Sequence, residues 1–575
     1  MSASPQVSDP RPLWEHVIGG IAALGAGTTL VMKLGGADLF WHVRAGQWIL
    51  EHGVSSSDPF SHTADGPWRY TEALAAVTLA VVHRAGGFTG LILFHALLGA
   101  VLAGLVWLLS AARRPGVNAV VVGAFAAGSH AAMAPKPQMF SYLLFALLLL
   151  WLRESERRQH AVKWLLPLPL LFGLWANLHR GGIIGVAVLL AALTSAALHR
   201  RERVPLLLLV LVLSAAALCL NPAGTFYLTS AFDVVSRVSF ASHIAEWAPL
   251  TVDGFLAHHW PLAPLGVLAL VGAFQGDAPE AKIRVGTPTL VFLGTALLAA
   301  RSARLLPFVA IAAAPLAARA LDGLAKRVTP WARPRLLDVG GLVLALALIA
   351  ARYLGAVPPG FRGLGVMESR VPVGIAEFLG QSPPPGRMFN ALDFGGYLIF
   401  ALGPEVPVFI DGRNDTLYDP AFVTQVFEAG RSAAHFQRVT EDRDIGFAVV
   451  RWSGPSDASY RFLHADPDWV LVHWDDAGCV LVRRTSASAA YLEHHGYAEL
   501  SLQDAFIRAS RLSPGEADAR FVDEVREALR RSPESLAIHY LSMVVEARLG
   551  NEGAFLEARR QVERLAEERG VVLDL

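Results

Sequence analysis

Several side chains that could take part in catalysis or binding follow the first apolar run of the sequence, in the stretch DLFWHVRAGQWILEHG. If this stretch is a helix, Asp38 and His42 share one face, because residues four apart lie above one another. A carboxylate beside an imidazole can take up a proton or hold a cation. On another face Arg44 lies near Trp41 and Trp48, where a guanidinium can stack on an indole. The alternative is an interfacial helix with its tryptophans at the lipid headgroups.

The composition indicates which elements must position these residues. The chain has 575 residues, of which 53% are hydrophobic and 17% are charged, whereas soluble proteins carry about 25% charged residues. The deficit lies in 1–355, where apolar blocks have the length that spans a bilayer as a helix. Residues 356–575 hold an ordinary share of charge. We therefore predict a polytopic membrane domain followed by soluble material. A net charge of +0 argues against a nucleic-acid partner.

The apolar blocks predict about 11 transmembrane helices. They lie near 14–34, 88–110, 118–133, 137–152, 161–176, 182–198, 203–220, 260–275, 286–300, 303–321 and 336–355. With the N-terminus in the cytoplasm, nearly every Lys and Arg cluster falls on the cytoplasmic side, as the positive-inside rule requires. The segment 72–85 breaks this pattern if it spans, so we expect an amphipathic helix on the outer membrane surface. The odd count then places loops 35–87 and 221–259 and the C-terminal part outside.

Residues 356–490 alternate short apolar runs with turns, which predicts an external α/β domain with a mixed sheet. The expected strands are GRMFN, YLIFAL, PVFIDGR, IGFAVVRW and the two arms of WVLVHWDDAGCVLVRR, with helices at 373–380 and 420–440. Residues 491–575 are helical and charged, and within them 532–565 resembles one tetratricopeptide unit, two amphipathic helices around a Gly-Asn turn. We expect this C-terminal helical cap to pack on the α/β domain or to bind a protein partner.

Two short motifs place acids and an arginine in turns. FIDGRND puts Asp411, Arg413 and Asp415 at a predicted strand end, which is where an α/β sheet usually holds a site. A salt-bridged turn is the alternative. SSSDPF is typical of a turn, with Asp58 in extended geometry before Pro59.

A charge at the centre of a membrane helix costs about 2.5 kcal/mol or more, so charged and polar side chains near the membrane are candidates for a functional role. Lys136 in APKPQMFSY is either a phosphate contact or a snorkelling lysine in a proline turn. In WANLHRGG, the side chains of Asn177, His179 and Arg180 meet at the outer end of a predicted helix. The two glycines that follow let a ligand or backbone come close.

Two arginines lie on the predicted outer side, against the positive-inside rule. Arg301 and Arg304 stand between two predicted membrane helices. A lipid phosphate is their natural partner, since arginine binds phosphate through two parallel hydrogen bonds. The alternative is a pairing with an internal carboxylate such as Asp38 or Glu246. Glu246 itself lies in the long external loop, as a base for the acceptor or as a solvated acid.

The stretch DLFWHVRAGQWILEHGVSSSDPFS, followed by GPWRYTEAL, resembles the first external loop of GT-C glycosyltransferases. The nearest likeness is the catalytic subunit of oligosaccharyltransferase in its archaeal form. There an Asp just after the first membrane helix precedes an aromatic residue, His and Arg, then a helix that ends in Gly and an Asp-Pro-Phe turn. Those enzymes take a sugar from a polyprenyl-phosphate or pyrophosphate carrier on the outer face. The resemblance implies that Asp38 is the catalytic base or an acidic metal ligand.

Other stretches match that family less closely. ALDFGGYL is similar to the Trp-Trp-Asp-Tyr-Gly signature that helps recognise the acceptor sequon, and it keeps Asp393 but has Ala391 and Leu392 for the tryptophans. HIAEW resembles the Thr-Ile-x-Glu motif, with His243 for Thr and Glu246 for Glu. The family's second external loop carries an Asp-x-Asp pair, whereas MAPKPQ has no acid. The chain also resembles a class of bacterial membrane proteins with the stretches WANLHRGG, NPAG and FIDGRND.

We therefore predict a glycosyltransferase of the bacterial inner (plasma) membrane, multi-pass, with its N-terminus cytoplasmic and its C-terminal domain periplasmic or extracellular. It would move a sugar from a polyprenyl-phosphate-linked donor to a glycan, lipid or protein acceptor. The predicted catalytic residues are Asp38, His42 and Glu246. The predicted substrate-binding residues are Arg44, Asp58, Lys136, Asn177, His179, Arg180, Arg301, Arg304, Asp393, Asp411 and Arg413.

No resident cofactor is predicted, because one external carboxylate and His42 make a poor cage for Mg²⁺. A divalent metal is the alternative. The alternative function is a catalytically inactive GT-C-like scaffold of an envelope assembly, which would work through the C-terminal helices.

Overall fold

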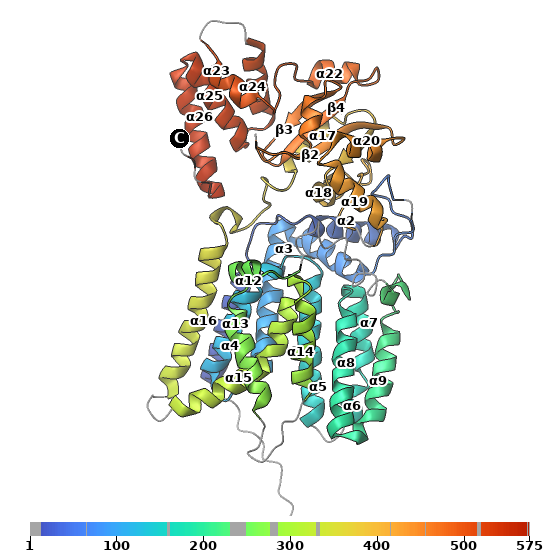
Figure 1. The fold of residues 1–575 in the computed structure, drawn as a ribbon, viewed down its shortest axis with the longest axis vertical. Coiled ribbons are helices and arrows are strands. Elements are labelled where there is room, and N and C mark those ends of the chain that lie inside the picture. Colours follow the sequence, from blue (N-terminus) through green and yellow to red (C-terminus); the bar gives the residue numbers. More distant parts are fainter. Residues whose placement is uncertain are drawn as a thin grey trace, which may run out of the picture. The chain divides into compact units, whose positions relative to one another are not determined.

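The computed structural model describes residues 13–64, 66–157, 161–229, 249–275, 286–328, 334–413, 416–454, 456–513, 519–571 and 573. The chain forms two compact units. The helical unit comprises 1–32 and 90–357, and the mixed unit comprises 33–89 and 358–575. The first external loop of the sequence prediction therefore belongs to the same unit as the C-terminal half of the chain (Figure 1).

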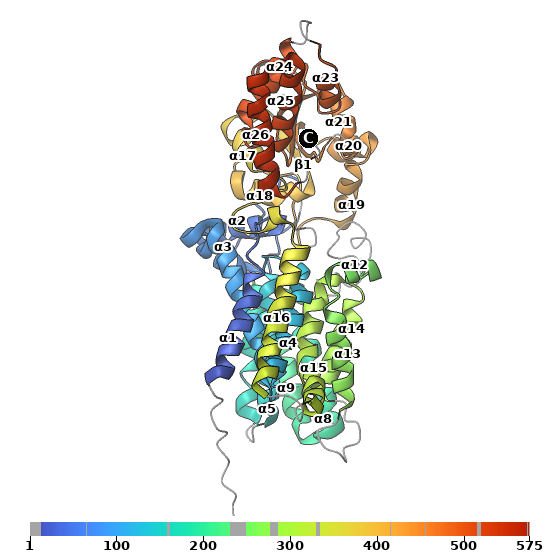
Figure 2. The same cartoon turned by 90° about the vertical axis from the view of Figure 1, so that its left-hand side faces the viewer.

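The helical unit is built from apolar helices that run side by side (Figures 1 and 2). Its described elements are α1 (Leu13–Thr28), the second part of α3 (Ala73–Ser110), α4 (Pro115–Ser129), η1 (His130–Ala132), α5 (Gln138–Arg157), α6 (Ala161–Leu165), α7 (Leu168–Leu178), α8 (Gly182–His199), η2 (Arg201–Arg203), α9 (Val204–Ala217), α12 (Val252–His258), α13 (Leu262–Phe274), α14 (Thr287–Ala299), η4 (Ala303–Leu305), α15 (Leu306–Val328) and α16 (Pro334–Ala356). Helix α4 packs against α1, α15 and α16. A Cβ on Gly123 of α4 would lie 2.7 Å from the Cα of Ala345 in α16, so small residues set this close approach.

Every predicted span contains a helix, but fewer of the described helices are long enough to cross a membrane on their own. In the described part of the chain, four helices are long and apolar enough to cross a membrane, and a fifth if 252–258 and 262–274, bent by 101°, form one span. Helices α13 and α14 have 13 residues each, about 20 Å, whereas the hydrocarbon core is about 30 Å thick. The count of about 11 crossings stays a prediction.

Helix α3 bends sharply at Gly87, which has φ 60° and ψ −153°. A glycine fits there because a side chain disfavours positive φ. The bend separates 73–86 from 88–110 and lies next to the boundary between the two units. The first part coincides with the segment predicted to lie on the membrane surface, and that placement stays a prediction.

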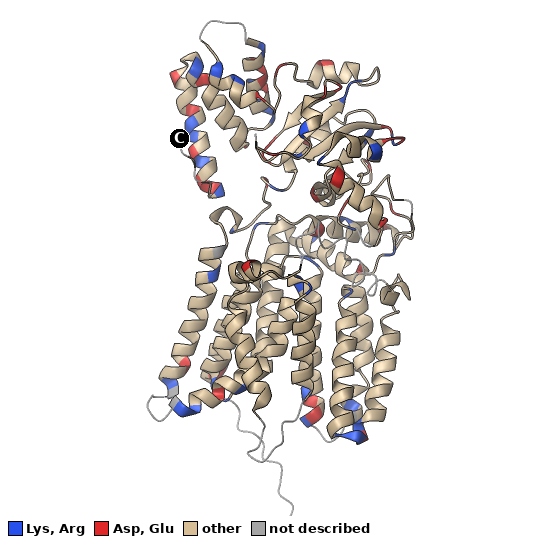
Figure 3. Ribbon diagram, in the orientation of Figure 1, with Lys and Arg blue, Asp and Glu red and all other residues tan. Residues whose placement is uncertain are grey.

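Charged side chains of the helical unit gather at one of its ends, near the turns after α5, α8 and α15 (Figure 3). Arg203 donates to the carbonyl of Ser155 at 2.7 Å. The backbone N–H of Gly116, in the first turn of α4, donates to the side chain of Asp338 in α16 at 3.2 Å. Such clustering is typical of one membrane face, and the assignment of this end to the cytoplasm stays a prediction.

The mixed unit surrounds a small sheet with helices. Besides α2 (Ala37–His52) and the start of α3, it contains η6 (Pro359–Phe361), α17 (Val373–Gln381), β1 (Arg387–Asn390), α18 (Leu392–Leu402), α19 (Pro420–Ala429), α20 (Ala433–Thr440), β2 (Ile445–Arg451), α21 (Arg461–Ala465), β3 (Trp469–Trp474), β4 (Gly478–Arg483), α22 (Ala489–His495), α23 (Ala505–Arg511), α24 (Ala519–Arg531), α25 (Leu536–Leu549) and α26 (Glu552–Arg569). The strand order is β1-β2-β4-β3. Strand β1 is parallel to β2, and the other pairs are antiparallel. The sheet is therefore mixed, as predicted.

Two predicted strands are not strands. YLIFAL lies within helix α18, which buries Phe394, Leu398 and Leu402 at helical spacing. PVFIDGR forms a single bridge to the first loop, at Val408. The side chain of Asn390 replaces the missing ladder: its Nδ2 donates to the carbonyl of Ile410 at 2.7 Å, and its Oδ1 accepts from the N–H of Phe409 at 2.7 Å.

The C-terminal helices pack on the hairpin between β3 and β4. Asp476 in the hairpin turn accepts the backbone N–H groups of Leu536 at 2.8 Å and Ala537 at 2.9 Å, and so caps α25. Arg531 of α24 donates to the carbonyl of Val472 in β3 at 2.9 Å. The cap therefore packs on the sheet, whereas its likeness to a tetratricopeptide unit stays a prediction.

One buried histidine under this cap predicts a pH dependence of stability. His473 of β3 is 2% exposed, and neither ring nitrogen has a hydrogen-bond partner in the described part of the chain. Its ring stacks on Phe378 with the centroids 4.6 Å apart. Burial, with help from the charge of Arg531, lowers the pKa of His473 to about 3. The unfolded chain, with a pKa near 6.5, therefore binds a proton more readily than the folded protein.

The stability contributed by neutral His473 is present above pH 6.5 and is lost as the pH falls toward 3, at about 1.4 kcal/mol per pH unit. We expect His473→Phe to remove this slope and to raise the free energy of unfolding at pH 7 by about 1 kcal/mol, because two unpaired nitrogens disappear. Urea unfolding of both proteins at pH 7 and pH 5 checks this. His494→Phe, at an exposed position, is the matched control. An equal pH slope in His473→Phe and the parent would contradict the expectation.

Candidate functional site

Asp38 lies in the first turn of α2, which begins at Ala37 without a side-chain cap. An acid there is favoured by the unpaired N–H groups at the helix N-terminus. Its carboxylate lies against Gly412: a Cβ on Gly412 would overlap the Oδ1 of Asp38 and come within 3.3 Å of the indole nitrogen of Trp41. The acid that opens the first loop thus contacts the FIDGRND turn, 374 positions later in the chain.

A pair of glycines in α18 brings that helix equally close. A Cβ on Gly396 would overlap the carbonyl of Ala37 and lie 3.4 Å from the ring of Trp41. A Cβ on Gly395 would lie 2.8 Å from the Cα of Asp411. The glycines of ALDFGGYL therefore let α18 pack against α2 and against the FIDGRND turn. Asp393 in the same motif is exposed and lies 3.5 Å from Arg451.

A buried arginine joins two predicted site residues. The Nε and Nη2 of Arg413 donate to the two carboxylate oxygens of Asp411 at 2.8 and 2.7 Å. Its Nη2 also donates to Asp58 at 3.2 Å, and its Nη1 contacts the other oxygen of Asp58. Tyr418 donates to Asp411 at 2.6 Å. We call Asp58, Asp411, Arg413 and Tyr418 the arginine clasp. The side chains of the two acids and the arginine are at most 2% exposed.

Three aromatic rings close around the guanidinium of the arginine clasp. The Cζ of Arg413 lies 5.1 Å from the ring of Trp68, 5.6 Å from that of Phe60 and 6.0 Å from that of Trp41. These distances are in the range of cation–π interactions. The indole nitrogens of Trp41 and Trp68 are buried and have no hydrogen-bond partner among the described residues. The sequence predicts that Asp58, Asp411 and Arg413 bind substrate. In the structure these three side chains bind one another, and their contact with a substrate stays a prediction.

The arginine clasp holds two carboxylates against one guanidinium. Burial alone would lower the pKa of Arg413, but Asp411 and Asp58 outweigh burial and hold it well above its ordinary value. Burial raises the pKa of Asp58, and Arg413 only partly opposes this rise. Burial and the charge of Asp411 raise the pKa of Tyr418 well above its usual range. Arg413 is therefore always charged, and Tyr418 remains a hydrogen-bond donor.

His42 lies in a separate buried network. Its Nδ1 is 2.9 Å from the hydroxyl of Tyr70, and its Nε2 is 3.5 Å from the carboxylate of Glu72. The ring stacks on Trp41 with the centroids 3.6 Å apart. Burial and Glu72 raise the pKa of Tyr70 well above its usual range. Sequence reasoning missed Tyr70 and Glu72, although GPWRYTEAL, which contains both, stood out by its aromatic residues.

Arg44 ties the first loop to the far end of α18. Its Nε donates to the carbonyl of Gly403 at 2.9 Å, and its Nη1 to the side chain of Gln47 at 3.3 Å. Gly403 directly follows α18. Arg44 thus joins α2 to the C-terminal end of α18. Its contact with a substrate stays a prediction.

In the helical unit, two more predicted site residues, Arg304 and His179, contact the first turn of α5. The Nη2 of Arg304 donates to the Oε1 of Gln138 at 3.2 Å. The hydroxyl of Tyr142 donates to the carbonyl of Arg304 at 3.0 Å. On the same helix, Ser141 lies 2.7 Å from the Nδ1 of His179. Arg304 and His179 therefore both pack on the N-terminal turn of α5, through residues that the sequence analysis did not list as site residues.

The contacts of His179 select its tautomer. The N–H of Gly181 donates to its Nδ1 at 3.0 Å. Ser141 accepts from the indole N–H of Trp175 at 2.7 Å, so its own hydroxyl proton is directed at Nδ1. A nitrogen that accepts from two donors carries no proton, and the ring proton lies on Nε2. In this tautomer His179 can donate a hydrogen bond through Nε2.

The other predicted site residues of the helical unit differ in their hydrogen bonds and in their exposure. The Nδ2 of Asn177 donates to the carbonyls of Gly173 at 2.9 Å and Leu220 at 2.7 Å, which ties α7 to the turn after α9. Arg301 is exposed, whereas Lys136 and Arg180 are half-buried. Glu246 and the HIAEW motif lie outside the described residues, as does Asp415. For this group the role in substrate binding stays a prediction.

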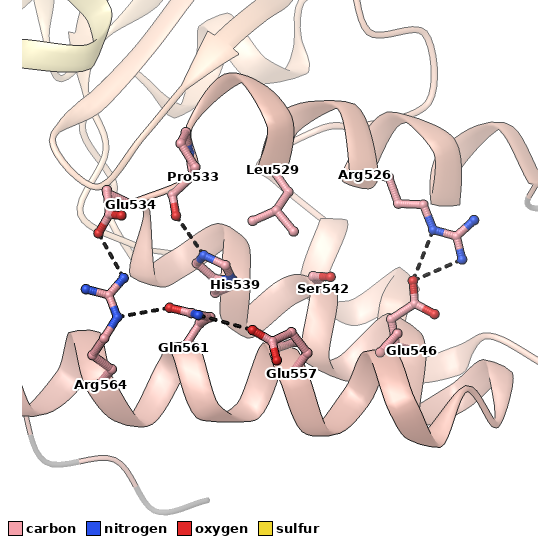
Figure 4. Close-up of a pocket in the computed structure, with 12 residues that line it drawn as sticks. Arg526, Leu529, Pro533, Glu534, His539, Ser542, Glu546, Glu557, Gln561 and Arg564 are labelled. Atoms are coloured by element: carbon pink, nitrogen blue, oxygen red, sulfur yellow. Dashed lines mark hydrogen bonds and ion pairs between the residues drawn. The ribbon is translucent and has the colours of Figure 1, made fainter.

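A groove of about 640 Å³ lies between α24, α25 and α26 (Figure 4). Its charged side chains pair with each other: Arg526 with Glu546 at 3.0 Å and Arg564 with Glu534 at 3.0 Å. Binding of a protein partner by the C-terminal cap stays a prediction. In the described part of the chain, no three His, Cys, Asp or Glu side chains are placed to share a metal ion, and we assign no metal ligand.

Known proteins match this chain by structure rather than by sequence. No protein-family model matches it, and no curated protein matches it. The oligosaccharyltransferase of Archaeoglobus fulgidus in the apo form is 11% identical; the alignment covers 96% of this chain and 86% of that chain, with a TM-score of 0.59. The same enzyme with an inhibitory peptide and a dolichol-phosphate is 11% identical over 95% of this chain and 84% of that chain, with a TM-score of 0.57. In complex with Zn and sulfate it is 12% identical over 94% and 83%, again with a TM-score of 0.57.

At 11% identity these structures establish the fold and not the chemistry. The likeness extends over nearly the whole chain, so it includes both the helical unit and the mixed unit. The resemblance predicted from the first external loop is confirmed at the level of the fold. The chain has the GT-C glycosyltransferase fold, in the form seen in the archaeal oligosaccharyltransferase.

Proposed function

We propose that the protein is a membrane glycosyltransferase that moves a sugar from a polyprenyl-phosphate-linked donor to an acceptor. The observation that carries this proposal is the placement of Asp38. In a chain with this fold, the acid that follows the first helix lies against the FIDGRND turn, and the glycines of α18 bring that helix close to both α2 and the turn. A dolichol-phosphate is bound in one of the similar structures, which makes a polyprenyl phosphate the first carrier to test.

Asp38 is the proposed general base. It takes the proton from the acceptor's hydroxyl or amide as the acceptor atom bonds to C1 of the sugar. The bond from C1 to the carrier oxygen breaks, and the carrier phosphate leaves with the electron pair. Donors aimed at the charge that develops on the phosphate stabilise it in many enzymes. Within the helical unit, Arg304 and the Nε2–H of His179 are the proposed contacts for a carrier phosphate.

The orientation is part of the proposal. The charged end of the helical unit faces the cytoplasm, as positive-inside clustering favours, and transfer takes place on the periplasmic or extracellular face of the bacterial inner membrane. The acceptor is a glycan, a lipid or a protein. The α18 motif keeps Asp393 and lacks the two tryptophans of the sequon-recognising signature, so an acceptor other than the sequon peptide is the first to test.

The direct test uses the purified protein in proteoliposomes with a panel of undecaprenyl-phosphate-linked radiolabelled sugars and a membrane extract as acceptor. The expected result is that label from at least one donor moves to an acceptor fraction. Carrier binding without consumption of any donor would favour the alternative function, an inactive scaffold that works through the groove of α24 to α26.

We expect Arg304→Gln to weaken binding of undecaprenyl phosphate by about tenfold or more, because charged donors to phosphate are the strong ones. Native mass spectrometry in detergent checks this, with undecaprenol as the ligand that lacks phosphate. Arg335→Gln is the matched control, since Arg335 is exposed in the first turn of α16 in the same unit. Equal affinity of Arg304→Gln and the parent for the phosphate lipid would remove Arg304 from the proposed site.

A further inference from the structure

We propose that Arg413 is a positioning residue: the arginine clasp fixes the turn around Gly412 against Asp38 and so sets the orientation of the Asp38 carboxylate. This inference rests on the proposed function, in which Asp38 is the general base. In this proposal Arg413 acts through its contacts with neighbouring residues and does not touch the substrate, since its side chain is 1% exposed.

The first argument is geometric. Gly412 lies between Asp411 and Arg413 in the sequence, and the side chains of both neighbours are bound to one another in the arginine clasp. The N–H of Arg413 also donates to Asp411 at 3.0 Å, which closes the turn on itself. The backbone of Gly412 therefore has a defined place. Asp38 packs so closely on Gly412 that even a methyl group would overlap it.

The second argument is that the arginine clasp joins segments distant in the sequence. Asp58 comes from the turn that follows α2, and its Oδ2 accepts the N–H of Ser61 at 2.9 Å. The ring of Trp41 belongs to α2 itself and lies one turn from Asp38. The guanidinium thus holds both the helix that carries Asp38 and the turn that faces it.

The third argument concerns side-chain chemistry. Arg413 binds Asp411 through Nε and Nη2 and Asp58 through Nη1 and Nη2. Only a planar fork with several fixed donors can bind two carboxylates in this way, and the point charge of a lysine cannot. Arg413→Lys therefore keeps the charge and loses the geometry. Tyr418→Phe is a milder change, because it removes only the hydroxyl that donates to Asp411.

The test reads the surroundings of position 38 without any need for activity. In an Asp38→Cys, Cys219→Ser background, iodoacetamide modifies the thiol introduced at position 38, and mass spectrometry follows its rate. Cys479 of β4 is fully buried in the same unit, so its modification reports unfolding of that unit. Arg443→Lys is the matched control: Arg443 lies over Phe422 and donates to the carbonyl of Val439, outside the clasp.

We expect Arg413→Lys to raise the modification rate at position 38 by about tenfold or more, with Cys479 unmodified and Arg443→Lys without effect. An unchanged rate at position 38 would overturn the proposal. If Arg413→Lys exposes Cys479, Tyr418→Phe decides: a faster reaction at position 38 alone supports the proposal, and no change overturns it. In the transfer assay, Arg413→Lys should lower kcat and leave the KM for the donor unchanged. The modification rate at position 38 does not depend on transferase activity. Failure of the proposed function and failure of the positioning role of Arg413 are therefore distinguishable.

Discussion

Asp38→Asn is expected to lower the rate of sugar transfer by about 10²- to 10⁴-fold, which is the usual contribution of a general base. The amide has the size of the carboxylate and can still form hydrogen bonds beside Gly412, but it cannot accept the acceptor's proton. The fold and carrier binding should therefore be nearly unchanged. Transfer from the undecaprenyl-phosphate-linked donor in proteoliposomes measures the rate, and thermal unfolding measures the stability.

Glu552→Gln is the matched control for this prediction, since Glu552 is an exposed acid in the first turn of α26. It should leave transfer at the parent rate. If Asp38 only stabilises the N-terminus of α2, Asp38→Asn will cost about 1 kcal/mol of stability and little activity. That outcome would leave the glycosyltransferase proposal without its base and would favour the scaffold function.

Arg413→Met is expected to lower the free energy of unfolding of the mixed unit by about 3–5 kcal/mol. The substitution leaves the carboxylates of Asp58 and Asp411 buried without their partner, and a buried unpaired charge is far more costly than the lost ion pair itself. Urea unfolding followed by tryptophan fluorescence is a suitable measurement, because Trp41 and Trp68 lie around the guanidinium.

Arg443→Met controls for the loss of an arginine that packs on aromatic rings without two buried acids. We expect a cost of about 1 kcal/mol or less there, the range of an exposed cation–π contact. Equal losses in the two variants would mean that the carboxylates of the clasp are not charged partners of Arg413. Adding Asp58→Asn to Arg413→Met should restore part of the lost stability, since one unpaired buried charge is then removed.

Local patterns predicted much of the fold. The helix from Asp38 to the glycine at position 53, the strands on either side of the Asp476 turn and the mixed character of the sheet follow from spacing and turn chemistry alone. The likeness of the first loop to GT-C enzymes led to the fold that the solved structures show. These features are local, because a helix or hairpin depends on residues close to one another in the chain.

The failures are non-local. YLIFAL has the composition of a strand, yet it lies in a helix that buries Phe394, Leu398 and Leu402 at helical spacing. PVFIDGR forms no strand, since Asn390 satisfies the backbone at Phe409 and Ile410 in place of a neighbouring strand. Nothing near Arg413 in the sequence shows that Asp58 is its second partner, as 355 positions separate them. The same holds for His42 and its contact with Tyr70, 28 positions away. Such pairs arise from packing between segments, which a single sequence does not encode by spacing.

Density for a bound carrier tests the central claim, a site for a lipid-linked donor on this fold, most directly. Electron cryo-microscopy of the protein in nanodiscs loaded with undecaprenyl phosphate would supply it. We expect phosphate density within hydrogen-bonding distance of the Nη atoms of Arg304 or the Nε2 of His179. Phosphate density elsewhere, or none at saturating carrier, would contradict a carrier site at these residues.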